Sequence, residues 1–237
     1  MKELTQELRS RLQRQISLIG EHATLKLINA KVCIIGLGGV GGYVTEMLAR
    51  SGVGQLYLVD CDTVSESNLN RQIIATLDTI GQKKTDVIAK RVLSINPDCS
   101  VTAHDLFVTK DNAAALVKQS DADIIIDCID NISAKVALIQ SARENNKYVF
   151  SAMGAGNKLN ISDYKICDIS KTHTCGLARA MRRQLREVGI DKLDVLFSTE
   201  QPSTDSGRTV SSICYMPSAA GLMIAEHIIK KIISDAF

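Results

Sequence analysis

The polar loop at residues 60–72 contains the side chains best suited to chemistry on a phosphate. It reads DCDTVSESNLNRQ and carries carboxylates at Asp60 and Asp62, an amide at Asn70 and a guanidinium at Arg71. Carboxylate oxygens are ligands that Mg²⁺ prefers, and a guanidinium forms paired hydrogen bonds with phosphate oxygens. A hydride-transfer site has no need of these carboxylates, amide and guanidinium together in one loop, whereas a site for a nucleoside triphosphate with magnesium uses all of them. The loop therefore favours ATP as the ligand.

A glycine-rich turn precedes this loop and supplies backbone N–H groups for a polyphosphate. An apolar run at residues 32–35 is long enough for a buried strand, and helical spacing of apolar residues begins at Val44. The glycines between them are Gly36, Gly38, Gly39 and Gly41. Such a strand–turn–helix unit places phosphates at the positive end of a helix. With Asp60, the GxGxxG spacing alone would suggest NAD, and the polar loop turns the prediction to ATP.

Two further charged residues complete the candidate site. Lys84 stands where the next helix is expected to begin and is suited to act as a mobile cation over the transferring phosphates. Asp130, in the segment DCIDN, follows a third apolar run and could hold Mg²⁺ together with Asp62. Each residue also has a plain structural interpretation, as a strand-end cap or a solvated helix charge. The combination in this order predicts the site.

Alternating strand and helix patterns position these residues. Buried strands are expected at residues 32–35, 55–59, 123–128 and 148–152, with helical spacing between them. This alternation predicts a mostly parallel sheet covered on both faces. Because ligands in such sheets lie beyond the carboxyl ends of the strands, Gly36, Asp60 and Asp130 should meet in one crevice.

The pattern changes after residue 155. Strands are expected near residues 161–169 and 193–198, with a helix at 177–188 between them and a long helix from about Pro217. The predicted fold is α/β: a Rossmann-like, mostly parallel sheet with helices on both faces, extended by a C-terminal α+β segment and a long C-terminal helix. We expect residues 1–155 to form the ATP-binding region and residues 156–237 a substrate-binding and dimerisation extension of the same domain.

Arginines concentrate on one side of the expected helix at 177–188. They are spaced at i, i+3, i+4 and i+7, so they share a face, and Lys171 lies just before the helix. The arginines are Arg179, Arg182, Arg183 and Arg186. A basic stripe on a protein with a formal charge of +2 suits a phosphate backbone such as that of RNA, and a simply solvated face is the alternative.

Composition excludes several other classes of protein. The 237 residues are 45% hydrophobic, and the seven cysteines include no C-x-x-C pair, so neither a disulfide framework nor a four-cysteine zinc site is expected. Reduced thiols and a charged N-terminus without a signal peptide indicate a cytoplasmic protein. The apolar stretch at 216–233 contains Glu226, His227, Lys230 and Lys231, so stable membrane insertion is not expected. Cys175 and Cys214 precede helices, but free cysteines are usually small buried hydrophobes, and neither is assigned a catalytic role.

The motifs GLGGVGG, DCDTVSESNLNRQ, GQKK and DCIDN closely resemble the ThiF/MoeB superfamily of adenylating enzymes, which are related to the ubiquitin-activating enzymes. The resemblance spans about residues 8–155 and includes Arg14-Gln15-Ile16, similar to that family's N-terminal arginine motif. It implies catalytic roles for Arg14, Arg71, Lys84 and Asp130. It also implies an ATP site formed by Gly36, Gly38, Gly39, Gly41, Asp60, Asn70, Arg71, Lys84 and Asp130. In the family the N-terminal arginine reaches the partner subunit's nucleotide, which implies a homodimer.

The segment at 168–190 resembles the tRNA threonylcarbamoyladenosine dehydratase branch of that family. This implies adenylation of a threonyl carboxylate on a modified tRNA adenosine, followed by ring closure with release of AMP, and it leaves open a sulfur-transfer protein as a partner. One alternative is an adenylyltransferase that acts on the C-terminus of a small sulfur-carrier protein, although such enzymes usually hold zinc with C-x-x-C pairs. A catalytically silent binding module is another alternative, against which the four catalytic residues argue.

Overall fold

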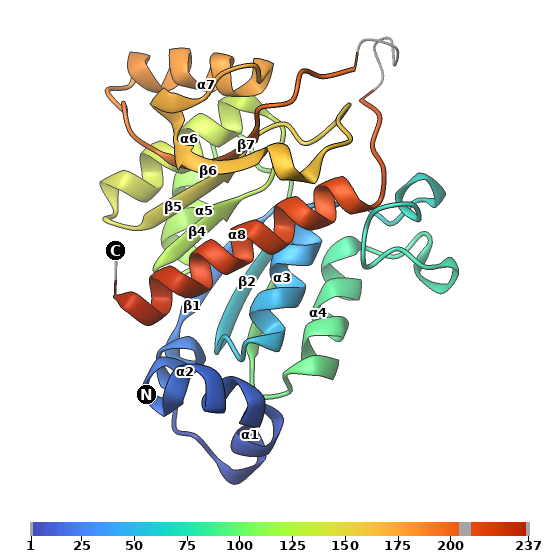
Figure 1. Cartoon of the computed structure of the whole chain (residues 1–237), viewed down its shortest axis with the longest axis vertical. Helices are drawn as coiled ribbons and strands as arrows, with labels where there is room; N and C mark the ends of the chain where they lie inside the picture. The colour runs from blue at the N-terminus through green and yellow to red at the C-terminus, as the bar shows by residue number, and fades with distance from the viewer. Residues whose placement is uncertain (1, 204–209, 236–237) are drawn as a thin grey trace.

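A single seven-stranded sheet in the order β3-β2-β1-β4-β5-β7-β6 forms the centre of the molecule (Figure 1). The computed structural model describes residues 2–203 and 210–235. The strands are β1 Lys31–Ile35, β2 Gln55–Asp60, β3 Ser100–Asp105, β4 Ile124–Asp127, β5 Tyr148–Ala152, β6 Tyr164–Asp168 and β7 Asp194–Ser198. Neighbouring strands are parallel except for the antiparallel pair β6–β7. The predicted fold class is confirmed, and pairing of β5 with β7 continues the sheet from one half of the chain into the other.

Helices cover both faces of this sheet. They are α1 Gln6–Arg11, α2 Gln13–Asn29, α3 Gly41–Arg50, α4 Lys84–Ile95, α5 Ala113–Gln119, α6 Ile132–Glu144, α7 Gly176–Glu187 and α8 Tyr215–Ser234. Buried residues of α2, α3, α4 and α8 share one core cluster, and those of α5, α6 and α7 share the other. In Figure 1 the long helix α8 crosses over α3. Within the described ranges no helix is both long and apolar enough to cross a membrane.

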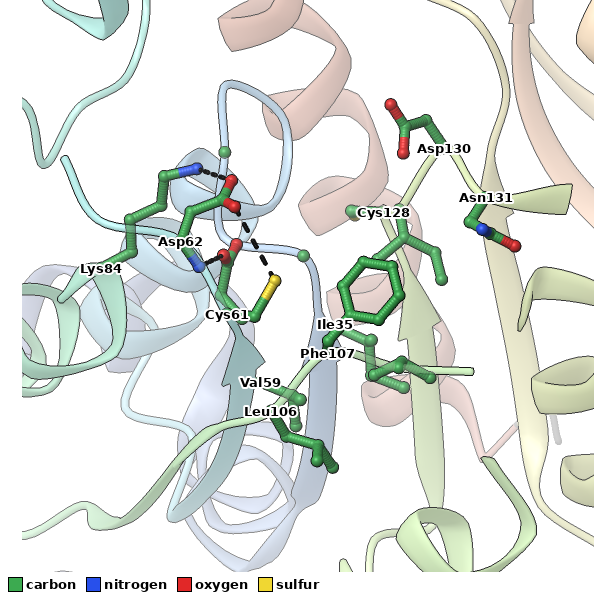
Figure 2. A pocket seen from close by; sticks show the side chains of 15 residues that line it. Ile35, Val59, Cys61, Asp62, Lys84, Leu106, Phe107, Cys128, Asp130 and Asn131 are labelled. Carbon is green, nitrogen blue, oxygen red and sulfur yellow. Dashed lines mark hydrogen bonds and ion pairs between the residues drawn. The ribbon is translucent and has the colours of Figure 1, made fainter. Parts of the chain in front are cut away.

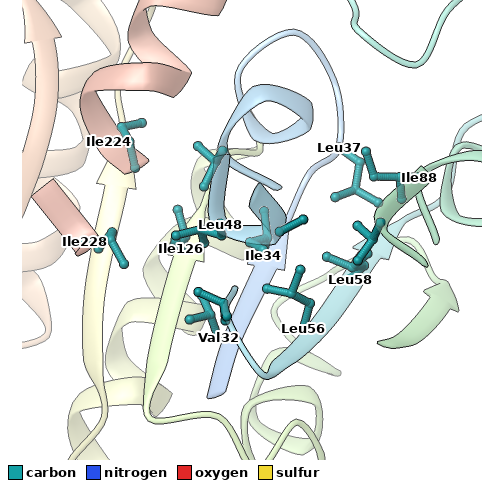
Figure 3. Packing of buried hydrophobic residues seen from close by; sticks show 14 of the residues in the cluster. Val32, Ile34, Leu37, Leu48, Leu56, Leu58, Ile88, Ile126, Ile224 and Ile228 are labelled. Carbon is teal, nitrogen blue, oxygen red and sulfur yellow. The ribbon is translucent and has the colours of Figure 1, made fainter. Parts of the chain in front are cut away.

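The central strand β1 shows why both faces must be covered. Val32 and Ile34 point into the cluster beneath α3 and α8, whereas Cys33 and Ile35 point into the opposite cluster, and all four are fully buried. Alternate residues of a strand face opposite sides of the sheet, so a strand apolar at every position requires a layer on each side. Figure 3 shows the first cluster, with Ile34 below α3 and Ile224 of α8 alongside.

One strand boundary differs from the prediction and the N-terminal helical segment is divided, in both cases for local reasons. The N-terminal helical segment is interrupted at Leu12 and again at Gly20, whose φ of +83° is not helical, and then continues to Asn29. Strand β6 begins only at Tyr164, because residues Ile161–Asp163 form a 3₁₀ turn. Apolar residues predict a buried segment without showing where the backbone turns.

A polar cluster lies where β5 and β7 begin, against α8. The Tyr148 hydroxyl donates to Asp194 Oδ2 at 2.6 Å and lies 3.0 Å from His227 Nε2. Lys231 lies over the Tyr148 ring, 4.3 Å from its centroid. Contact with His227 and then the bond from Tyr148 lower the pKa of Asp194 from 3.8 to about 2.

Asp194→Asn should therefore remove a pH-dependent part of the stability. Because the folded-state pKa is depressed, the carboxylate stabilises the native state above about pH 4, and this contribution is lost as the pH falls towards 2. The carboxylate is partly exposed, so we expect a difference of about 1 kcal/mol between the free energies of unfolding of wild type and variant near neutral pH. Urea unfolding at a series of pH values measures it. A difference that stays constant down to about pH 2.5 would contradict this assignment.

Candidate functional site

The glycine turn lies at the point where the strand order reverses, between β1 and β4. Gly36 has a φ of +89°, and a Cβ there would lie 2.8 Å from the carbonyl oxygen of Cys128. A Cβ on Gly41 would lie 1.8 Å from the carbonyl oxygen of Gly36. The turn can therefore be this tight only with glycine at both positions, and it leads directly into the N-terminus of α3. This is the geometry that lets backbone N–H groups approach a phosphate.

Asp60, at the end of β2, accepts a hydrogen bond from the glycine turn and also lines the crevice. Its Oδ2 accepts from the backbone N–H of Leu37 at 2.6 Å, and its Oδ1 accepts from that of Asp62 at 2.8 Å. Each carboxylate oxygen keeps a second lone pair, so Asp60 can still accept hydrogen bonds from ribose hydroxyls.

Lys84 and Asp62 form an ion pair on the same wall. Lys84 begins α4, and its Nζ lies 2.7 Å from Asp62 Oδ2. The Lys84 side chain is only 6% exposed, whereas that of Asp62 is 62% exposed. The hydrogen bond from Lys84 is the main cause that holds the pKa of Asp62 below its usual value. A buried ammonium group thus lies next to a carboxylate that is open to a ligand.

These residues line one cavity of about 280 Å³. Of the predicted residues, its lining includes Gly36, Gly38, Asp60, Asp62, Lys84 and Asp130. Figure 2 shows Asp62 and Lys84 on one side and Asp130 with Asn131 on the other. The expected meeting of strand ends in one crevice is therefore observed.

Asp62 is grouped with Asp60 rather than with Asp130 as a candidate metal ligand. Ligand atoms of Asp60, Cys61 and Asp62 lie within 4.8 Å of one another, and Asp130 is not in this group. Burial is the main cause that raises the pKa of the Cys61 thiol, so oxygen ligands dominate the cluster. Carboxylate oxygens fit Mg²⁺, a hard cation that retains several waters and bridges to substrate phosphates.

Asn70 and Arg71 lie outside the cavity lining, beside the glycine turn. Arg71 Nη1 donates to the carbonyl oxygen of Ser67 at 2.7 Å and to Asn70 Oδ1 at 2.9 Å. Asn70 Nδ2 donates to the carbonyl oxygen of Ser212 at 3.2 Å. A Cβ on Gly39 would lie 3.7 Å from Arg71 Cγ. The Arg71 side chain thus lies beside the turn, with its guanidinium bonded to neighbouring residues of the loop.

Arg14 lies at the opposite end of the sheet from this cavity. It is exposed in the first turn of α2, next to Leu12. Leu12 lines a separate hollow with Arg50 and Gly52, at the end of α3 farthest from the glycine turn. Arg14 therefore does not reach the nucleotide cavity of its own chain, and its predicted role requires a second chain.

The arginine stripe on α7 is only partly free. Arg179, Arg183 and Arg186 are exposed, as is Lys171 just before the helix. Arg182 is half-buried, and its Nη1 donates to the carbonyl and hydroxyl oxygens of Thr172. Arg182 thus anchors α7 to the preceding segment rather than standing in the stripe.

Sequence reasoning missed an apolar wall of the cavity and two buried lysines. Leu106, Phe107 and Val108 line the cavity directly after β3, and Phe107 remains 60% exposed there. Lys158, beyond β5, is buried and donates to the carbonyl oxygens of Gly154 at 3.3 Å and Ser198 at 3.4 Å; burial lowers its pKa. The second lysine that was missed, also buried, is Lys135 of α6. The apolar triplet at residues 106–108, directly after a strand, could have indicated the wall. Nothing in the sequence distinguishes Lys135 and Lys158 from exposed lysines.

Cys175 and Cys214 differ in exposure. Cys175 is buried at the N-cap of α7, and Cys214 is exposed at the N-cap of α8. All seven cysteines are free thiols. Neither Cys175 nor Cys214 lines the nucleotide cavity.

The fold and the cavity define a nucleotide-binding α/β protein, and comparison with known proteins identifies its family. Residues 12–236 match the ThiF family. The tRNA threonylcarbamoyladenosine dehydratase of Bacillus subtilis (strain 168) is 37% identical over 235 residues, 92% of each chain. This chain therefore belongs to the ThiF family.

Solved structures agree with this assignment. The E. coli tRNA N6-threonylcarbamoyladenosine dehydratase in complex with AMP has a TM-score of 0.93 at 33% identity, over 100% of this chain and 99% of that one. Its complex with ATP has a TM-score of 0.92 at 32% identity, over 99% of this chain and 98% of that one.

A second kind of relative matches less of the chain. The adenylyltransferase and sulfurtransferase MOCS3 of Drosophila virilis is 37% identical over 131 residues, 54% of this chain and 28% of that one.

Proposed function

We propose that this protein is an ATP-dependent tRNA threonylcarbamoyladenosine dehydratase. The observation that carries the proposal is the cavity beside the glycine turn, which is lined by Asp60, Asp62, Lys84 and Asp130. The chain that holds this cavity matches a dehydratase of this name over 92% of its length, and the dehydratase that it resembles in structure binds ATP and AMP.

The reaction takes place in two steps. The threonyl carboxylate of the modified adenosine attacks the α-phosphate of ATP, which releases pyrophosphate and leaves an acyl-adenylate. A nitrogen of the same substrate then forms a bond to the acyl carbon, loses its proton and expels AMP. The nucleoside has lost one water in total, and the enzyme needs no nucleophile of its own. Lys84 stabilises charge on the phosphates, and the glycine turn positions them.

The charges on the cavity wall support a requirement for Mg²⁺. Three carboxylates, Asp60, Asp62 and Asp130, line the cavity with the single ammonium group of Lys84. A divalent cation held by these carboxylates would offset the repulsion between such a wall and a triphosphate. Asp62 is the exposed carboxylate of its cluster, so we assign it to the magnesium that accompanies ATP. Asp130 lies across the cavity from Asp62, and its share in holding the same ion stays a prediction.

Activation of a sulfur-carrier protein is the second candidate. MOCS3, whose name describes an adenylyltransferase and sulfurtransferase, matches only 54% of this chain. The cysteines here stand at positions 33, 61, 99, 128, 167, 175 and 214, none of them in a C-x-x-C pair. The dehydratase proposal therefore accounts for more of the chain.

We further propose a homodimer in which Arg14 of one chain completes the cavity of the other. The placement of Arg14 far from its own cavity supports this, because an exposed arginine in the family's motif would otherwise have no role. Residues 1–155 would bind ATP, and residues 156–237 would bind substrate and contribute to the dimer. A sulfur-transfer partner and a cytoplasmic location stay predictions.

The free arginines of α7 are the proposed tRNA contacts. Arg179→Glu with Arg183→Glu should lower tRNA affinity by about 10-fold or more and flatten its salt dependence, because phosphate contacts release counterions. ATP affinity should not change. The matched control is Lys90→Glu with Lys230→Glu on α4 and α8, which cover the other face of the sheet. Filter binding at several salt concentrations measures the tRNA affinity of each variant. Equal affinities for the two double variants would show that the arginine face of α7 is only solvated. Arg182 is left intact because it anchors α7.

Release of AMP tests the proposed function and separates it from the second candidate. The protein is incubated with ATP and magnesium together with tRNA that carries threonylcarbamoyladenosine, with tRNA that lacks it, or with a sulfur-carrier protein. We expect AMP only with the modified tRNA. AMP formation with the carrier protein alone would replace the dehydratase proposal with its alternative.

A further inference from the structure

A fully buried ion pair lies directly behind the Asp130 wall of the cavity. Asp127 is the last residue of β4, Lys135 lies in α6, and both side chains have no exposed surface. Lys135 Nζ lies 2.8 Å from Asp127 Oδ2. The pair faces the core cluster of α5, α6 and α7, where the neighbouring residues are apolar.

Each of the three N–H donors of the Lys135 ammonium group has an acceptor. Besides Asp127, Nζ donates to the carbonyl oxygen of Ile129 at 3.0 Å and to that of Ala152 at 2.9 Å. Asp127 is equally well satisfied, since Oδ2 accepts from Ser151 Oγ at 2.7 Å and Oδ1 accepts from the backbone N–H of Ile129 at 3.2 Å. One pair therefore joins the ends of β4 and β5 to α6.

The same pair holds both backbone groups of Ile129, the residue before Asp130. Its N–H is bonded to Asp127 and its carbonyl group to Lys135. Cys128, on the other side of Ile129, contributes the carbonyl oxygen against which Gly36 packs. The segment that carries Asp130 is thus fixed to the core and to the glycine turn.

Stability alone is a weak reason for such a pair. Taking two charges out of water costs several kcal/mol per ion, and a buried ion pair can often be replaced by apolar residues without loss of stability. What apolar residues cannot supply is a set of directed hydrogen bonds to the backbone groups of Ile129 and Ala152.

We propose that Lys135 and Asp127 are positioning residues that fix Asp130 on the nucleotide cavity. They do not touch the nucleotide and act through the backbone of Ile129. This inference rests on the proposed role of Asp130 at the ATP site.

A double-mutant cycle tests whether Lys135 acts through Asp130. Lys135→Met, Asp130→Asn and the double variant are compared with wild type for the rate of AMP formation in a single turnover. We expect each single change to slow the reaction by about 10–100-fold, as is typical for residues that support a catalytic group. We expect the double variant to be no slower than the slower single variant, because Lys135 has no function once Asp130 is lost.

An ion pair with one buried partner serves as the control. Glu46 Oε2 of α3 lies 2.7 Å from Arg91 Nε of α4, and the Glu46 side chain is buried whereas that of Arg91 is partly exposed. Glu46→Gln should lower the melting temperature, as Lys135→Met does, while leaving the rate of AMP formation unchanged. A wild-type rate for Lys135→Met, or rate losses that multiply in the double variant, would overturn the proposal.

Two further measurements keep the outcome decisive. If Lys135→Met does not fold, Ser151→Ala replaces it, since this change removes one bond to Asp127 and little volume. If wild type forms no AMP from the modified tRNA, the dehydratase proposal fails on its own. The same cycle is then measured as ATP affinity in magnesium by calorimetry, where additive effects of Lys135→Met and Asp130→Asn would still refute the positioning role.

Discussion

Lys84→Met should slow AMP formation by about 10²–10³-fold while the protein remains folded. Lys84 Nζ is the buried cation of the cavity, held 2.7 Å from Asp62, and in a site shielded from water such a donor stabilises developing charge strongly. Methionine has a similar length and packs well in a buried position, so the fold should persist. Single-turnover assays with saturating ATP measure the rate, and circular dichroism checks the fold.

The neighbouring lysine provides the control. Lys83 Nζ forms an ion pair with Asp105 Oδ2 at 2.7 Å, and both side chains are about half exposed at the surface. Lys83→Met should therefore leave AMP formation within about 2-fold of wild type, as expected for an exposed pair. Equal losses in Lys83→Met and Lys84→Met would mean that neither lysine has a special role at the phosphates.

Gly36→Ala should abolish ATP binding, with a loss of affinity of at least about 100-fold. Alanine is strained at a φ of +89°, and its Cβ would lie 2.8 Å from the carbonyl oxygen of Cys128, so the glycine turn and the Asp130 segment must separate. Calorimetric titration with ATP measures the affinity.

Gly81→Ala separates the effect of backbone strain from the effect of the close contact with Cys128. Gly81 has a φ of +82°, and a Cβ there would meet nothing within 4 Å. This variant should carry a comparable backbone strain, about 1–2 kcal/mol, and still bind ATP. If Gly81→Ala and Gly36→Ala reduce ATP affinity equally, the close approach of the glycine turn to Cys128 is not what matters.

The cavity could be predicted from the sequence because its residues follow strand ends. Once apolar runs define parallel strands, Gly36, Asp60 and Asp130 must share one edge of the sheet, whatever their side-chain conformations. Lys84 was likewise expected at the start of a helix, and it is the first residue of α4.

Contacts between segments far apart in the chain were not predictable in the same way. Helical periodicity gives Arg182 the same face as Arg179 and Arg183, and only the position of Thr172 shows that Arg182 is tied down. Lys135 looks like an ordinary helix lysine until its three oxygen partners come together from β4, its following loop and β5. The proposed role of Arg14 depends on a second chain, which a single sequence does not position.

The most direct measurement is nucleoside mass spectrometry on tRNA that carries threonylcarbamoyladenosine. After incubation with the protein, ATP and magnesium, the tRNA is digested and the modified nucleoside is weighed. We predict loss of one water from threonylcarbamoyladenosine, dependent on ATP and absent with Lys84→Met. A nucleoside of unchanged mass, recovered from an incubation in which the protein binds both ATP and the tRNA, would contradict the assignment of this ThiF-family protein as a dehydratase.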